Sequence, residues 1–199
     1  MSARRSWWGL LLIGVLVYLM ALVMQLPARA VWSLAEGPLS EIPELQISPP
    51  SGTIWQGAIG VLGYREVQLR NLRWAWDPLD LLQGRLGYDL AFAHVDGQGQ
   101  AEIGFGFVDV LVRDLRVDLP ALVLSDGFDS LPATLEGRLL LSAPLTRWDY
   151  QGQPLDVEAR LGWLDAAAGL GAPMAIGDLR AEISSPAPGR LVALLSDQG

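Results

Sequence analysis

The stretch 155-LDVEARLGW-163 alternates apolar residues with charged or small ones at every step. A period of two places these two sets on opposite faces of a β-strand, with one face packed and the other in water. The stretch therefore predicts one half-buried strand of an antiparallel sheet.

The same alternation recurs elsewhere along the chain, at residues 67–76, 86–92, 103–107 and 135–141, with Gly, Asp or Pro between the runs. Short strands separated by turn residues are typical of an all-β domain. The phase of the alternation changes near Asn71, which predicts a β-bulge or bend. From residue 52 onward, the sequence thus predicts an antiparallel, meander-type curved sheet or β-groove.

Helical signals are few in this part of the chain. Asp77 is a capping residue, Pro78 suits the first helical position and Gly84 suits the end, so a short helix is predicted between them. Residues 163–169 (WLDAAAG) predict a second short helical turn. Residues 31–52 hold four prolines and predict an irregular linker.

An apolar segment lies near the N-terminus, where residues 7–26 read WWGLLLIGVLVYLMALVMQL without a charge. As a helix, it would extend about 30 Å, the thickness of the hydrocarbon core of a bilayer. Arg4 and Arg5 precede it, and the positive-inside rule then places the N-terminus in the cytoplasm. This predicts a single transmembrane helix with the anchor residues Trp7, Trp8, Leu11, Leu12, Ile13, Val15, Leu16, Leu19, Leu22 and Val23.

A cleaved signal peptide is the alternative interpretation, because residues 28–30 (ARA) fit a cleavage site after Ala30. Signal peptides usually have apolar cores of about 7–15 residues. The segment here is longer, which favours an uncleaved anchor. The predicted organisation is a cytoplasmic tail (1–6), an anchor (7–26), a linker (27–51) and an exported β domain (52–199) that is expected to continue in a longer parent chain.

Acidic residues dominate the exported part. All 14 basic residues of the chain are arginine, and residues 1–30 contain three of them and no acid. The rest of the chain contains the other 11 arginines and all 22 Asp and Glu residues, so its net charge is negative. Nucleic acids and anionic headgroups require a basic surface, so we expect neither as a direct partner of the folded part. Cysteine is absent, which excludes disulfides and thiolate metal sites.

The sequence offers little catalytic chemistry. His94 is the sole histidine, falls at the end of a predicted strand and has no obvious partner that would make it a general base. Lysine and the G-x-S-x-G motif of serine hydrolases are both absent. Residues 126–129 (DGFD) supply too few oxygen ligands for calcium and predict a solvated turn. We therefore expect no enzyme, no cofactor and no metal site.

Four tryptophans are the candidate core or interaction aromatics of the exported part: Trp55, Trp74, Trp76 and Trp163. Indoles on a surface often form binding sites for partners or ligands, whereas indoles in phase with other apolar residues fill a core. Trp74, Trp76 and Trp163 share the phase of their apolar neighbours, which favours packing in a core.

Several short motifs follow in a fixed order: LPA at residues 26–28, SGTIWQG at 51–57, LRWAW at 72–76, LPATLEGRL at 131–139 and GW at 162–163. In their order and spacing, the chain resembles protein N of the type II secretion system of Gram-negative bacteria. The resemblance implies an inner-membrane protein with a periplasmic β domain that assists export of folded proteins across the outer membrane. It implies no catalytic residues.

Three functions are open at this point. The favoured one is a non-enzymatic inner-membrane component of the type II secretion system that contacts the inner-membrane platform or the secretin. The alternative is an envelope protein similar to the AsmA type, which would bind or guide lipid in a β-groove. The third is a periplasmic hydrolase or carbohydrate binder, which needs two carboxylates facing each other across a cleft.

Overall fold

The computed structural model describes residues 3–40, 42–65, 67–123, 134–169, 173–187 and 189–197. The described helices are α1 (Ala3–Met24), α2 (Ala28–Ser40) and the 3₁₀-helix η1 (Pro78–Gln83). The strands are β1 (Leu45–Ile47), β2 (Ser51–Gly52), β3 (Gln56–Tyr64), β4 (Val67–Asp77), β5 (Leu86–His94), β6 (Gly97–Phe105), β7 (Asp109–Pro120), β8 (Thr134–Asp149), β9 (Pro154–Gly169), β10 (Met174–Ala187) and β11 (Arg190–Asp197).

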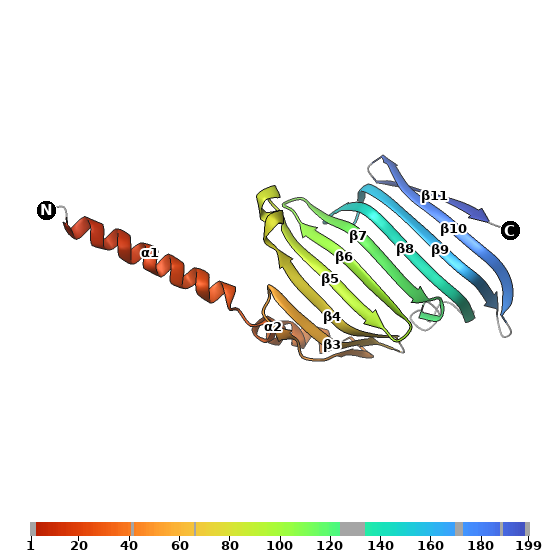
Figure 1. Ribbon diagram of the computed structural model, residues 1–199, viewed down its shortest axis with the longest axis horizontal. Coiled ribbons are helices and arrows are strands. Elements are labelled where there is room, and N and C mark those ends of the chain that lie inside the picture. Colours follow the sequence, from red (N-terminus) through yellow and green to blue (C-terminus); the bar gives the residue numbers. More distant parts are fainter. Residues whose placement is uncertain are drawn as a thin grey trace.

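All eleven strands of the described residues belong to one antiparallel sheet (Figure 1). From β3 to β11 each strand pairs with the next one in sequence, and β1 and β2 both pair with β3. This order is the predicted meander. The sheet is long and narrow, with α1 projecting from one end and β11 at the other (Figure 1).

The two faces of the sheet differ in polarity, as the alternation predicts. On one face, cross-strand neighbours form a continuous apolar row of Phe92, Gly99, Val117, Leu141, Leu161, Ala181 and Leu195. On the other face, the adjacent row consists of Ala91, Gln100, Arg116, Ser142, Arg160 and Glu182. The apolar row is buried or half-buried except for Leu195, whereas every member of the second row is exposed.

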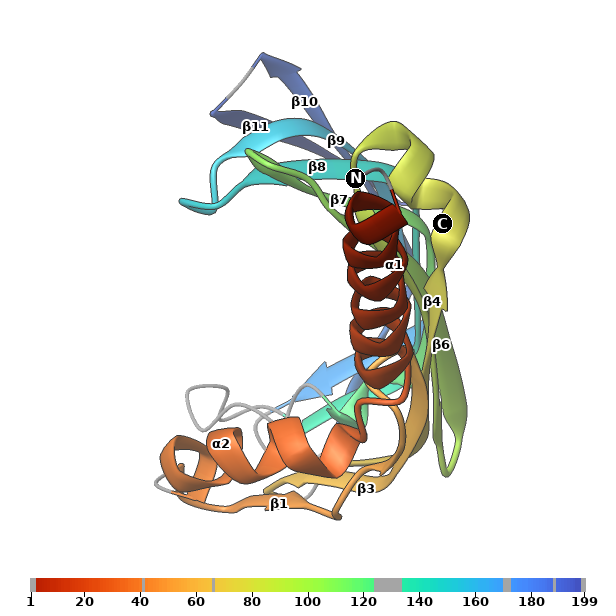
Figure 2. The same cartoon turned by 90° about the vertical axis from the view of Figure 1, so that its left-hand side faces the viewer.

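The strands bend into a C, with α2 inside the curve and the yellow η1 outside it (Figure 2). Val31 of α2 lines a small apolar cavity together with Trp74 of β4, on the face of the apolar row. Asp80 of η1 packs instead against Gly87, on the face of Ala91, where a Cβ atom would lie only 2.2 Å from the Asp80 carboxylate. We therefore call the two faces the inner face and the outer face, and the apolar row the inner row.

Three strands of the sheet contain a bulge. Asn71, Asp114 and Asp165 have positive φ values of 51°, 46° and 49°. The pairing register shifts beside each of them. Asn and Asp tolerate the left-handed backbone better than most other residues, and a bulge bends its strand. The irregularity predicted near Asn71 is confirmed.

The helical predictions have mixed outcomes. The short helix after Asp77 is confirmed as η1, where Leu79 N donates to Asp77 Oδ1 (2.8 Å) and Gly84 ends the helix with φ 71°. The predicted turn at residues 163–169 is wrong, because β9 continues to Gly169 and pairs with both β8 and β10. Backbone pairing on both sides overrides the local helical preference of the alanine-rich segment.

The predicted irregular linker is also wrong in its first half, because residues 28–40 form α2. The prolines that suggested a loop lie in the last turn of this helix or after it. Ala28 of α2 is buried, and Trp32 and Leu39 are half-buried, so one side of the helix is covered. This packing stabilises a helix that is too short to persist alone in water.

Large side chains are never completely buried in the described part of the chain. The buried apolar residues are small or medium in size: Ala28, Ala121, Ala143, Val157, Ala166 and Ala181. A two-layer domain normally buries its large apolar residues between the layers. Here the described strands form one layer, and α2 covers only one end of it.

Candidate functional site

The predicted anchor residues lie on α1, and those whose side chains are described are all exposed: Trp7, Leu11, Leu12, Ile13, Val15, Leu16, Leu19, Leu22 and Val23. Their exposed fractions run from 47% to 77%. The backbone of Arg4, Arg5 and Trp8 is also helical. Among the residues that the structure describes, no helix combines the length and the apolar character needed to cross a membrane.

Three of the four candidate tryptophans form one cluster where α1 meets the sheet. The rings of Trp55 and Trp76 lie 4.8 Å apart between centroids. Trp74 Nε1 donates to the carbonyls of Thr53 (3.2 Å) and Ile54 (3.1 Å). The structure thus brings the motifs at residues 51–57 and 72–76 into direct contact.

This tryptophan cluster also holds the end of α1 against the sheet. Trp55 Nε1 donates to the carbonyl of Val23 (2.8 Å), and Ile54 N donates to the carbonyl of Leu26 (3.1 Å). The carbonyl of Val23 also accepts a hydrogen bond from Leu26 N (3.2 Å), and Leu26 lies just after the end of α1. The helix and the first strands are therefore joined by specific bonds.

The hydrogen bonds of the cluster lead to a mutational prediction. We expect Trp74→Phe to cost about 1–2 kcal/mol more unfolding free energy than Trp76→Phe, because only Trp74 loses hydrogen bonds. Trp76 Nε1 is buried and has no hydrogen-bond partner in the described part of the chain. Both substitutions remove similar apolar area, so each serves as the control for the other. Urea unfolding of the two variants measures the difference, and equal costs would contradict it.

The fourth tryptophan lies apart from this cluster. Trp163 on β9 is paired with Leu139 on β8, and its Nε1 donates to the carbonyl of Glu136 (2.9 Å). The motif at residues 162–163 therefore contacts the described part of the motif at residues 131–139, whose first three residues lie outside the described chain. All four tryptophans are half-buried, so they line the surface of the sheet without forming an enclosed core.

A small cavity of about 250 Å³ lies between α2 and the inner face. Its lining is apolar and consists of Ala28, Val31, Trp32, Pro50, Ile54, Ile59 and Trp74. The indole N–H of Trp74 is engaged by the two carbonyls, so the ring presents apolar surface to the cavity. The cavity could not be predicted from the sequence, because the segment that forms α2 was expected to be irregular.

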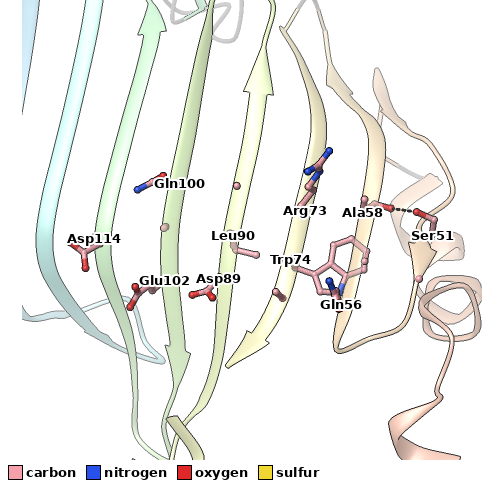
Figure 3. A pocket seen from close by; sticks show the side chains of 15 residues that line it. Ser51, Gln56, Ala58, Arg73, Trp74, Asp89, Leu90, Gln100, Glu102 and Asp114 are labelled. Atoms are coloured by element: carbon pink, nitrogen blue, oxygen red, sulfur yellow. Dashed lines mark hydrogen bonds between the residues drawn. The ribbon is translucent and has the colours of Figure 1, made fainter. Parts of the chain in front are cut away.

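A larger depression, of about 580 Å³, lies over β3 to β7 (Figure 3). Asp89 and Glu102 are direct cross-strand neighbours there, so they project side by side from one face and do not oppose each other across a cleft. Glu102 also pairs with Arg113 (3.2 Å). This arrangement does not supply the acid and base of the hydrolase hypothesis.

A network of ion pairs fixes η1 to the outer face. Arg113 Nη2 lies 2.9 Å from both carboxylate oxygens of Asp80, a residue only 2% exposed. The hydrogen bond with Asp80 raises the pKa of Arg113 above its ordinary value, although burial opposes this shift. Nearby, Arg85 pairs with the buried Asp109 (3.0 Å). Since each charge is matched, we interpret this network as structural support.

Other candidate residues are isolated from these clusters. His94 ends β5, as predicted, and its Nδ1 accepts a hydrogen bond from Asp96 N (3.3 Å). The predicted acidic turn at residues 126–129 lies outside the described residues. Among the described residues, no group of three or more His, Asp or Glu side chains could hold a metal ion.

Comparison with known proteins identifies the family of the chain. The family model for the type II secretion system (T2SS), protein N, matches residues 43–199. The type II secretion system protein N of Klebsiella pneumoniae is 30% identical over 196 residues, which are 95% of this chain and 72% of that protein. The protein of the same name from Vibrio cholerae serotype O1 is 28% identical over 177 residues, 86% of this chain and 66% of that protein. No solved structure matches. The chain therefore belongs to the type II secretion system protein N family.

Proposed function

We propose that the chain is a non-enzymatic component of the type II secretion system, anchored in the inner membrane by residues 7–26. In this proposal, residues 1–6 are cytoplasmic and the sheet lies in the periplasm, where it contacts the inner-membrane platform or the secretin. The observation that carries the role in secretion is the family match over residues 43–199. The anchor is supported by the uncharged segment at residues 7–26 and by Arg4 and Arg5 before it.

The contacts around Ala30 favour an uncleaved anchor over a cleaved signal peptide. Cleavage after Ala30 would cut α2 near its start and would remove Ala28, which is only 6% exposed. It would also remove Arg29, whose Nε donates to the carbonyl of Pro50 (3.3 Å), and Val23, the acceptor of the Trp55 indole. A segment so integrated with the sheet is expected to stay attached to it.

A reporter fusion tests the topology. Alkaline phosphatase fused after residue 52 is expected to be active, because the enzyme folds only outside the cytoplasm. The mass of the mature protein is expected to include residues 1–30. As a control, replacing residues 1–26 with a cleavable signal peptide should keep the reporter active but release the chain from the membrane. An inactive reporter, or a mature chain that begins at Val31, would contradict the proposed anchoring.

Deletion of the chain tests the role in secretion. A deletion strain is expected to retain type II substrates in the periplasm, and the full chain is expected to restore their export. Residues 27–199 behind a cleavable signal peptide provide the matched control and should restore export poorly. Photocrosslinkers at the exposed outer-face residues Ser142 and Arg160 are expected to capture the platform or the secretin. Normal export in the deletion strain would overturn the proposed role.

A further inference from the structure

The inner face is the concave side of the bent sheet, and we call this concave face the trough. Figure 2, which looks along the sheet from its α1 end, shows the strands bending into a C around this face. The inner row crosses the strands from β5 to β11, so it follows the length of the trough towards the end opposite α1 (Figure 1). The result is a continuous apolar track that leads away from the helix.

The chemistry of the track suits hydrocarbon. The inner row consists of Gly99 and six residues whose side chains carry no hydrogen-bond donor or acceptor. Protein interfaces generally contain about one hydrogen bond per 100–200 Å², so a protein partner would be expected to meet polar groups along the track. The row is half-buried at most of its positions and exposed at Leu195. Contiguous apolar surface that stays in contact with water is unfavourable and is typical of binding grooves. An occupant without polar groups therefore fits the track best.

The cavity beneath α2 connects this track to the membrane end of the molecule. Trp74, which lines the cavity, is paired with Leu90 on β5, and Leu90 is paired with Ala101 on β6. Leu90 lies two residues before Phe92, the first member of the inner row. The tryptophan cluster places the cavity directly beside the end of α1. Apolar surface thus continues from α1 through the cavity into the trough.

We propose that the trough binds an acyl chain of a membrane phospholipid, which enters at the cavity beneath α2. The headgroup stays outside the trough, because the inner row offers it no side-chain hydrogen-bond partner. The occupant is hydrocarbon because the track is apolar throughout and continuous with a helix that, under the proposed function, lies in the bilayer. This inference rests on the proposed anchoring of residues 7–26.

Photolabelling of the full chain tests this inference. The probe is phosphatidylethanolamine with a diazirine in one acyl chain, incorporated into vesicles that contain the purified protein. Labelled residues are located by peptide mass spectrometry. We expect labels in α1 and also along the inner face between residues 59 and 195. Labels in α1 report anchoring, so they form an internal standard for each variant.

Two neighbouring leucines on β8 provide matched variants. Leu141 belongs to the inner row, whereas Leu140 is on the outer face and 37% exposed. Leu141→Glu places a charge in the trough and is expected to reduce labelling of the sheet at least tenfold relative to α1, because a carboxylate is costly beside hydrocarbon. Leu140→Glu introduces the same charge on the outer face and should leave the labelling unchanged.

The possible outcomes separate the two proposals. Labels confined to α1 in the unmodified chain would overturn the acyl-chain trough while supporting the anchor. Absence of labels in α1 would overturn the anchoring itself. Equal losses of sheet labelling in Leu140→Glu and Leu141→Glu would also overturn the proposal that the trough binds an acyl chain. The label positions in the unmodified chain decide between these outcomes even if Leu141→Glu fails to fold.

Discussion

Asp80→Ala is expected to lower the free energy of unfolding by about 3–5 kcal/mol, the cost of removing one partner of a buried ion pair. Asp80 is 2% exposed and accepts two hydrogen bonds of 2.9 Å from Arg113. Without this carboxylate, Arg113 stays charged, because a guanidinium group is not deprotonated in proteins. Among the described residues, Glu102 would remain as an ion-pair partner of the half-buried Arg113.

This loss is measured by urea titration of the full chain in detergent, with tryptophan fluorescence as the signal for unfolding. Glu182→Ala is the matched control, because Glu182 is 68% exposed and lies 3.5 Å from Arg160. Exposed pairs contribute at most about 1 kcal/mol. If Asp80→Ala lowered the free energy of unfolding no more than Glu182→Ala does, the ion pairs beneath η1 would not stabilise the fold.

Gly137→Ala is expected to destabilise the chain by about 2–5 kcal/mol, from backbone strain and overpacking together. Gly137 has φ 104°, a conformation that residues with a Cβ atom rarely adopt. An added Cβ atom would lie 2.4 Å from the carbonyl oxygen of Leu164 and 2.6 Å from that of Asp165. These are backbone atoms of β9 and cannot turn aside as a side chain would.

The same unfolding titration tests this prediction, with Gly162→Ala as the control. Gly162 lies on β9, opposite Leu140 of β8, and an added Cβ atom would meet nothing closer than 3.8 Å. The control should change stability by less than about 0.5 kcal/mol. A similarly small change in the stability of Gly137→Ala would mean that β8 and β9 can move apart to make room for the added Cβ atom, which would contradict the prediction.

Much of the sheet could be predicted because alternation is a local signal. Residues 155–163 alternate strictly and lie in β9, and the change of phase near Asn71 marks a real bulge. The end of β9 could not be predicted, because Ala166 to Ala168 favour a helix locally and are held as strand by pairing with β8 and β10. Such pairing between distant residues leaves no trace in a short window of sequence.

The candidate site was predictable only in part. The tryptophans were visible from the sequence, but the bond from Trp55 to Val23 joins residues 32 positions apart. The ion pair between Asp80 and Arg113 was not predicted, because an acidic residue in a short helix is usually exposed to solvent. Its one signal is Gly87, which leaves room for the carboxylate on the strand that follows η1. The trough depends on curvature, and a bulge bends its strand. The bulges at Asp114 and Asp165 were not predicted, although the apolar phase shifts between Val112 and Leu115.

Consecutive pairing from β3 to β11 has a consequence for how the molecule is made. Each strand joins a neighbour that left the ribosome just before it, and no strand has to be inserted between two others. Folding dominated by such near-neighbour contacts is fast and needs few long loop closures. The sheet can therefore assemble in the order of translation, growing one hairpin at a time from the end nearest α1.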